Sequence, residues 1–184
     1  MIGNDIVDLN LAKTQSNWQR KGFLEKQFTD YEQKLIKNSD NPFLKVWLFW
    51  SMKEAAYKCY TQEFQKRFYA PLKFSCKIIN KSTGIVKIES KKYYIKTNLT
   101  GRYVYSVAQE YQSKKMVSHL FFVDKNENKT KKIKQKLLAC FDQKVWLKKN
   151  GLGIPYLYQH NKKLPISIST THHGNYGAFV ISYL

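Results

Sequence analysis

The sequence predicts an α+β protein, because stretches with helical spacing alternate with short β-rich runs. Residues 23–36 and 42–62 have helical composition, and Thr29 followed three residues later by Glu32 predicts a capped helix start near Thr29. Residues 72–110 contain short β-branched and aromatic runs separated by the turn sequences NKSTG and NLTG, which predicts three or four antiparallel strands. Each half of the chain offers a helix followed by strands, a pattern that permits two similar lobes.

Strands are also predicted at both ends of the sequence. IGNDIVDL (2–9) is typical of a short buried strand with Asp5 and Asp8 towards its far end. Near the other end, ISIST and YGAFVISYL are predicted strands on either side of THHGN, and we expect His172 and His173 in a turn between them. The basic stretch 125–136 is the predicted connection between lobes.

Composition limits the classes of function. The chain has 184 residues, 43% of them hydrophobic, which fits one compact core or two small lobes. Its net charge of +19 favours an acidic partner: nucleic acid, an anionic membrane, a polyphosphate ligand or an acidic protein. The three widely spaced cysteines indicate neither a disulfide framework nor a zinc site and favour a reducing cytoplasm. No signal peptide or membrane-spanning segment is predicted.

WSMKEAAYK (50–58) carries the most distinctive spacing. In a helix, Trp50, Glu54 and Lys58 lie along one face. Two interpretations stay open. Glu54 and Lys58 form a surface ion pair, or Glu54 binds a hard metal ion such as Mg²⁺, which needs a second acid. Asp5 is the candidate for that acid, although a strand-end turn in which Asp5 and Asp8 accept backbone hydrogen bonds explains these residues equally well.

Nucleic-acid binding is the alternative that the charge and the 13 tyrosines keep open. The basic residues are spread along the chain, however, and no signature of a nucleic-acid-binding module is present. Neither a GxGxxG nor a Walker A motif occurs, which argues against the common nucleotide-binding folds.

Taken together, the motifs resemble those of the 4′-phosphopantetheinyl transferase superfamily. They are GNDIVDL (3–9), FTDYE (28–32) and WSMKEAAYK (50–58), supported by GIP (153–155) and STTHHGNYGAFV (169–180). The resemblance implies that superfamily's fold, with two similar lobes that each pack a helix on an antiparallel sheet. It also implies Mg²⁺-dependent transfer of the phosphopantetheine arm of coenzyme A to a serine of an acyl or peptidyl carrier protein, which is holo-acyl-carrier-protein synthase activity.

Site residues follow from the resemblance, motif by motif. Asp5 and Glu54 would ligate the metal, Glu54 would help to remove the serine proton, and Lys58 would stabilise charge on the pyrophosphate. His172 matches the histidine that contacts coenzyme A phosphates. The acidic carrier protein and the phosphates of coenzyme A would then account for the basic charge of the chain.

Two positions depart from the family pattern. Val7 stands where surfactin-type enzymes carry an acid, so water is expected to replace a third protein ligand of the metal. Ile154 replaces the basic residue often found in the Gly-x-Pro motif, and Lys148, Lys149 or Lys162 is expected to contact phosphate instead. These departures keep an inactive coenzyme-A-binding member as a further alternative.

The order of the motifs predicts a rearranged domain organisation. The Gly-x-Pro and Ser-His segments, which precede the other motifs in surfactin-type enzymes, come last here. We therefore expect circularly permuted lobes: a metal-bearing lobe at residues 1–112 and a lobe supporting coenzyme A binding at 113–184. A permuted enzyme would be a monomer, whereas a single lobe with a long insertion would work as a trimer.

Overall fold

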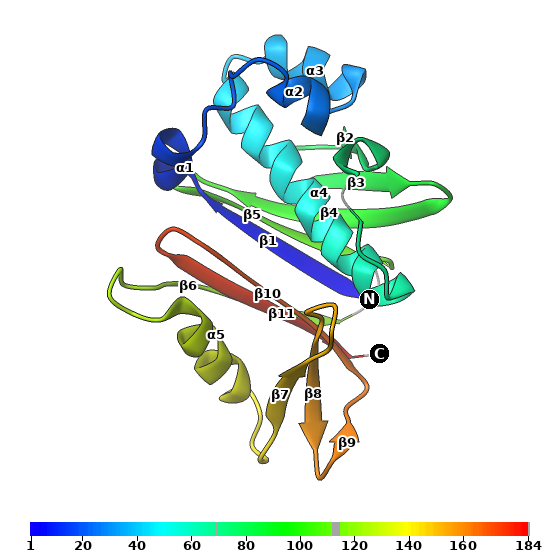
Figure 1. Cartoon of the computed structure of the whole chain (residues 1–184), viewed down its shortest axis with the longest axis vertical. Coiled ribbons are helices and arrows are strands. Elements are labelled where there is room, and N and C mark those ends of the chain that lie inside the picture. Colours follow the sequence, from blue (N-terminus) through cyan, green and yellow to red (C-terminus); the bar gives the residue numbers. More distant parts are fainter. Residues whose placement is uncertain (69, 112–114, 184) are drawn as a thin grey trace.

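The first half of the chain forms a five-stranded antiparallel sheet crossed by one long helix. A computed structural model describes residues 1–68, 70–111 and 115–183 (Figure 1). Strand order is β1-β5-β4-β3-β2. The strands are β1 (Ile2–Asp8), β2 (Ser75–Ile78), β3 (Thr83–Ile88), β4 (Lys91–Leu99) and β5 (Tyr103–Gln109). The helices are α1 (Leu9–Gln15), α2 (Phe23–Gln27), α3 (Asp30–Lys37), α4 (Pro42–Phe64) and the short 3₁₀ helix η1 (Pro71–Lys73).

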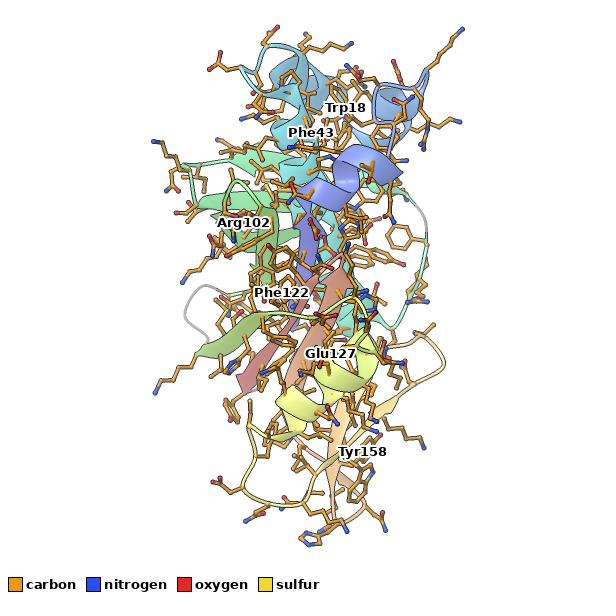
Figure 2. All side chains as sticks on the ribbon, turned by 90° about the vertical axis from the view of Figure 1, so that its left-hand side faces the viewer. Trp18, Phe43, Arg102, Phe122, Glu127 and Tyr158 are labelled. Atoms are coloured by element: carbon orange, nitrogen blue, oxygen red, sulfur yellow. The ribbon has the colours of Figure 1, made fainter. Side chains whose placement is uncertain are left out.

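The second half forms two smaller antiparallel sheets. One has the order β10-β11-β6 and packs against a helix; the other has the order β7-β8-β9. The elements are β6 (Met116–Phe122), α5 (Lys129–Leu138), β7 (Trp146–Lys149), β8 (Pro155–Gln159), β9 (Lys162–Lys163), β10 (Ile166–His173) and β11 (Tyr176–Tyr183). The side view in Figure 2 places Arg102 on the first half and Tyr158 towards the far end of the second.

The predicted fold class is confirmed: the protein is α+β, with a helix packed on an antiparallel sheet in each half. Helix α4 is apolar around most of its circumference and forms the main core with the first sheet. Helix α5 packs through Ile133 and Leu137 against a smaller core that includes Phe179 of β11. Four strands fill the region where three or four were predicted.

Three local predictions are wrong or incomplete. Residues 23–36 form two helices, since Phe28 is extended and the capping box of Thr29 and Glu32 starts α3 anew. His172 and His173 end strand β10; the turn begins at Gly174. The basic stretch 125–136 does not connect the halves, because it follows β6 of the second sheet and most of it is helix α5. The expected lobe boundary at 112/113 lies outside the described residues.

Strands β1 and β10 run side by side and join the two halves through a seam of side-chain hydrogen bonds. The backbone N–H groups of Ile2 and Asn4 donate hydrogen bonds to the hydroxyls of Ser167 and Ser169, and each donor–acceptor distance is 3.1 Å. At the end of the seam, the Asp8 N–H donates a hydrogen bond to Nδ1 of His173 at a distance of 2.9 Å. These three pairs share a sequence separation of 165, so the strands are parallel and in constant register.

Among the described residues, no helix combines the length and apolar character needed to cross a bilayer.

Candidate active site

Asp5 lies where helix α4 crosses strand β1. Its Oδ1 accepts hydrogen bonds from Lys58 Nζ at 3.0 Å and Thr171 Oγ1 at 3.3 Å. Lys58 also donates to the Asn4 carbonyl at 2.8 Å, so the lysine ties α4 to β1. Burial raises the pKa of Asp5, and the charge of Lys58 opposes that rise.

The surface ion pair between Glu54 and Lys58 does not form, because Lys58 turns to Asp5 instead. Glu54 makes no hydrogen bond or ion pair with another described residue. Its pKa is raised by burial and by the negative charge of Asp5, and is partly restored by Lys58. The helix therefore presents a partly buried carboxylate that has no partner in the described part of the chain and is close enough to Asp5 for their charges to interact.

The remaining acid near this site, Asp8, has a structural role. Its Oδ1 caps α1 by accepting from the N–H groups of Asn10 and Leu11, and Oδ2 accepts from Asn175 N–H. The strand-end interpretation is thus confirmed for Asp8, while Asp5 bonds to side chains from α4 and β10.

A cavity of 440 Å³ opens beside the two carboxylates; we call it the carboxylate cavity. Its walls come from β1, α4, the end of β10 and the segment around α1, and include Asp5, Val7, Arg20, Trp50, Glu54 and His172. Trp50 stacks on Phe23 with ring centroids 6.3 Å apart, so it packs α4 against α2. Arg20 is a basic residue of this cavity that sequence motifs did not indicate.

Two further cavities, unlike the carboxylate cavity, are lined by Lys58. One of 320 Å³ lies against α5 (the α5 cavity) and is lined by Asp5, Lys58, Lys134, Lys149 and His172 among others. The other, of 200 Å³, lies at the Gly-Ile-Pro turn (the turn cavity) and also includes Lys58 and Lys149. The pKa of His172 is lowered by burial and by the nearby positive charges of Lys129, Lys58 and Lys149.

The predicted phosphate-binding residues are therefore only partly brought together. Lys58, Lys149 and His172 share the α5 cavity. Lys148 and Lys162 are exposed residues of β7 and β9, and neither is among the described residues that line the cavities reported above. Since β7 alternates its side chains, Lys148 points away from the face that Leu147 and Lys149 present to the α5 cavity.

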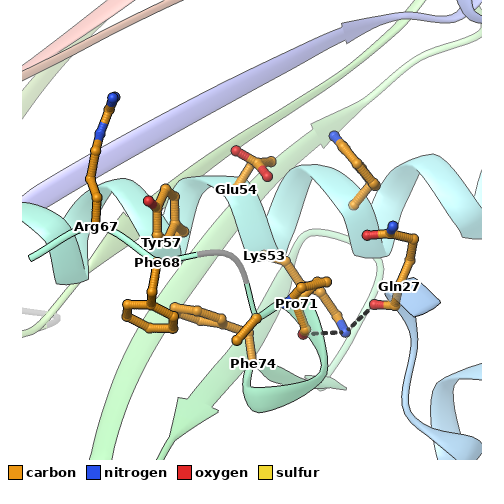
Figure 3. Close-up of a pocket in the computed structure, with 10 residues that line it drawn as sticks. Gln27, Lys53, Glu54, Tyr57, Arg67, Phe68, Pro71 and Phe74 are labelled. Atoms are coloured by element: carbon orange, nitrogen blue, oxygen red, sulfur yellow. Dashed lines mark hydrogen bonds between the residues drawn. The ribbon is translucent and has the colours of Figure 1, made fainter. Parts of the chain in front are cut away.

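A fourth cavity, of 280 Å³ and mainly aromatic, lies on the opposite side of Glu54 (Figure 3). Trp50, Tyr57, Phe68 and Phe74 supply its rings. Lys53 closes one end and donates hydrogen bonds to the carbonyls of Gln27 and Pro71, drawn as dashed lines in Figure 3. Glu54 lines both this aromatic cavity and the carboxylate cavity.

The donor set suits a hard divalent cation held by few protein ligands. Asp5 and Glu54 offer carboxylate oxygens, which Mg²⁺ prefers, and the unpartnered charge of Glu54 would be compensated by a cation. Within the described residues no cluster of three or more His, Cys, Asp or Glu side chains is arranged to hold a metal. Val7 is apolar and buried, so two protein carboxylates plus water and substrate oxygens are what this site has to offer.

Comparison with models of protein families identifies the family of this chain. Residues 1–112 match the model of the 4′-phosphopantetheinyl transferase superfamily. The chain belongs to this superfamily. Comparison with curated protein sequences gives no match.

Two solved structures show distant likeness. Helicobacter pylori holo-[acyl-carrier-protein] synthase in complex with coenzyme A is 17% identical with a TM-score of 0.45, covering 59% of this chain and 97% of that one. The Thermotoga maritima holo-[acyl-carrier-protein] synthase is 10% identical with a TM-score of 0.46, covering 88% of this chain and 83% of that one.

Proposed function

We propose that this chain transfers the 4′-phosphopantetheine arm of coenzyme A to a serine hydroxyl of an acidic acyl or peptidyl carrier protein. The reaction requires Mg²⁺ and releases adenosine 3′,5′-bisphosphate. The observation that carries the proposal is the pair Asp5 and Glu54, within a chain of this superfamily. Glu54 is partly buried and has no hydrogen-bond or ion-pair partner among the described residues, and it lines both the aromatic cavity and the carboxylate cavity, which also holds Arg20.

Asp5 and Glu54 would hold the magnesium ion, which supplies stabilisation of the negative charge that develops on the pyrophosphate. Glu54, directly or through a water molecule, would also help to remove the serine proton. Lys58 keeps Asp5 in place through the 3.0 Å bond and exposes its ammonium group to the α5 and turn cavities. There it would stabilise phosphate charge together with His172 and Lys149.

The second half of the chain would support coenzyme A binding. His172 and Lys149 come from residues 113–184, whereas Asp5, Glu54 and Lys58 come from residues 1–112. A circularly permuted pair of lobes in one chain accounts for this division, and the seam between β1 and β10 supports it. We expect a solution mass of one chain; a trimer would contradict the permuted arrangement.

The test is intact mass spectrometry of an apo acyl carrier protein after incubation with this protein and coenzyme A. We expect a gain of one phosphopantetheine arm with Mg²⁺ and no gain when the metal is chelated. Several carriers are needed, since the pathway is not specified by the residues at the site. Binding of coenzyme A without transfer to any carrier would favour the inactive family member. Binding of DNA at moderate salt with no activity on coenzyme A would favour the nucleic-acid alternative.

A cytoplasmic location, consistent with the free thiols of Cys59, Cys76 and Cys140, belongs to the same proposal.

A further inference from the structure

The turn cavity contains a basic residue that no motif indicates. Arg67 lies three residues beyond the end of α4 and lines this cavity with Lys58 and Lys149. No Asp or Glu is among the described residues that line it. Lys58 is paired with Asp5, whereas Arg67 and Lys149 have no ion pair with another described residue. The cavity therefore carries uncompensated positive charge.

The path of the chain after α4 brings Arg67 to the second half. Gln65 ends α4 in the left-handed conformation, with φ of 51°. Its Oε1 accepts hydrogen bonds from Asn150 Nδ2 at 3.1 Å and the Tyr156 hydroxyl at 3.2 Å. These bonds hold the segment that carries Arg67 against the turn between β7 and β8.

Arg67 lies directly against Gly153. A β-carbon added to Gly153 would lie 3.4 Å from Nη2 of Arg67, and this glycine has a φ of +73°. The Gly-Ile-Pro turn thus leaves room for a guanidinium group where the motif itself supplies Ile154, which is buried and apolar. In Figure 3 the side chain of Arg67 points away from the aromatic rings, towards the same side of α4 as Glu54.

A second feature of the cavity is an unsatisfied hydroxyl. Thr61 lines the cavity and is 5% exposed, and its Oγ1 is buried without a hydrogen-bond partner among the described residues. Because this oxygen is closed off from solvent, a ligand would reach it only after the side chain rotates. The cations Lys58, Arg67 and Lys149 are therefore what the cavity presents to an oxyanion.

We infer that Arg67 binds a phosphate group of coenzyme A at the Gly-Ile-Pro turn, and so supplies from the first half of the chain the cation that the turn lacks. Guanidinium groups bind phosphate with two parallel hydrogen bonds, which lysine cannot reproduce. The inference rests on the proposed function, because it takes coenzyme A as the ligand.

Calorimetric titration with coenzyme A, without carrier protein, tests the assignment. We expect Arg67→Gln to weaken binding about 10- to 100-fold, the loss of one charge-assisted hydrogen-bonded pair. The affinity of Arg67→Lys for coenzyme A should fall between those of Arg67→Gln and the wild type, since lysine keeps the charge but not the paired hydrogen bonds. The matched control is Arg102→Gln, which removes an exposed arginine on the turn between β4 and β5 (Figure 2) and should bind as the wild type does.

Dephospho-coenzyme A and adenosine 3′,5′-bisphosphate identify which phosphate is bound. If Arg67→Gln weakens the binding of coenzyme A and the bisphosphate, but not of dephospho-coenzyme A, Arg67 binds the 3′-phosphate. If it weakens the binding of coenzyme A and dephospho-coenzyme A equally, Arg67 binds the pyrophosphate. Affinities of Arg67→Gln and Arg67→Lys within twofold of the wild type for all three ligands would overturn the inference while leaving the transferase proposal intact. Failure of the wild type to bind any of them would instead contradict the proposed function.

Discussion

The two sides of helix α4 carry the same types of charge but use them differently. On one side, Lys53 and Glu32 form a buried ion pair of 2.7 Å. Lys53 also donates to two backbone carbonyls, and both oxygens of Glu32 accept backbone N–H groups, those of Thr29 and Cys76. On the other side, Lys58 bonds to Asp5, while Glu54 has no partner among the described residues.

Burial alone does not separate these roles, because acids and lysines are withdrawn from water on both sides. The two sides differ in whether each charged group has hydrogen-bond partners. The Lys53–Glu32 pair is saturated, so it anchors α4 to α2, α3, η1 and β2. Glu54 has no such partner among the described residues, which leaves its carboxylate free to bind a ligand and motivates the role proposed for it. The predictions below compare the two sides.

The largest effect is expected on activity at Glu54. Glu54→Gln keeps the size of the side chain but removes its charge and basicity. We expect the rate of carrier modification to fall by at least about 1,000-fold, as for loss of a main group that stabilises transition-state charge. Steady-state kinetics and thermal unfolding measured together would check this. An unchanged rate would remove Glu54 from the mechanism.

The next effect is expected on stability at Glu32. Glu32→Gln leaves Lys53 charged and buried without its counter-ion, which should cost about 3 kcal/mol of unfolding free energy. Urea denaturation gives the value. The control is the double variant Glu32→Gln with Lys53→Met, which removes both charges and should recover part of the loss. If Glu32→Gln is as stable as the wild type, the anchoring role is wrong.

A smaller effect is expected from Mg²⁺ and pH. Mg²⁺ at 100 times its dissociation constant should stabilise the protein by about 2.7 kcal/mol near pH 7.5. Because the pKa values of Asp5 and Glu54 are raised, the folded protein binds protons more strongly than the unfolded chain. Without metal, stability should therefore fall as pH rises from the ordinary pKa range of these acids to their raised values.

Protons and metal compete for the same carboxylates, so the stabilisation by Mg²⁺ should vanish as pH falls through the raised pKa values. Thermal melts with and without Mg²⁺ across pH would measure this. Glu54→Gln should lose the metal response, whereas a variant of the anchoring side, Lys53→Met with Glu32→Gln, should retain it.

Much of the fold could be predicted because local signals agreed with the final structure. The capping box at Thr29 and Glu32 forms as the sequence indicates, and the turn sequences separate strands as expected. Within the site, Asp5, Glu54 and Lys58 do come together, although their roles stay proposals. The helix start predicted at Thr29 is confirmed, but the separate helix α2 before it was not predicted, since apolar residues on either side of Phe28 continue a helical spacing.

The partners of these residues could not be predicted from spacing within the chain. Lys58 is four residues from Glu54, yet it pairs with Asp5, 53 positions away. Arg67 and Arg20 belong to no motif and reach their cavities only through the path of the backbone. For Lys53 a signal did exist: a lysine within a helix that is apolar nearly all round must be paired.

The seam between β1 and β10 also restricts how the two halves can align. A shift by one residue would present Ile168 in place of Ser167, and would leave the buried N–H group of Ile2 beside an apolar side chain. A shift by two would carry His173 away from Asp8. The serine hydroxyls and His173 together thus favour a single alignment, which fixes the distance from Asp5 to the Gly-Ile-Pro turn that coenzyme A would span in the proposed reaction.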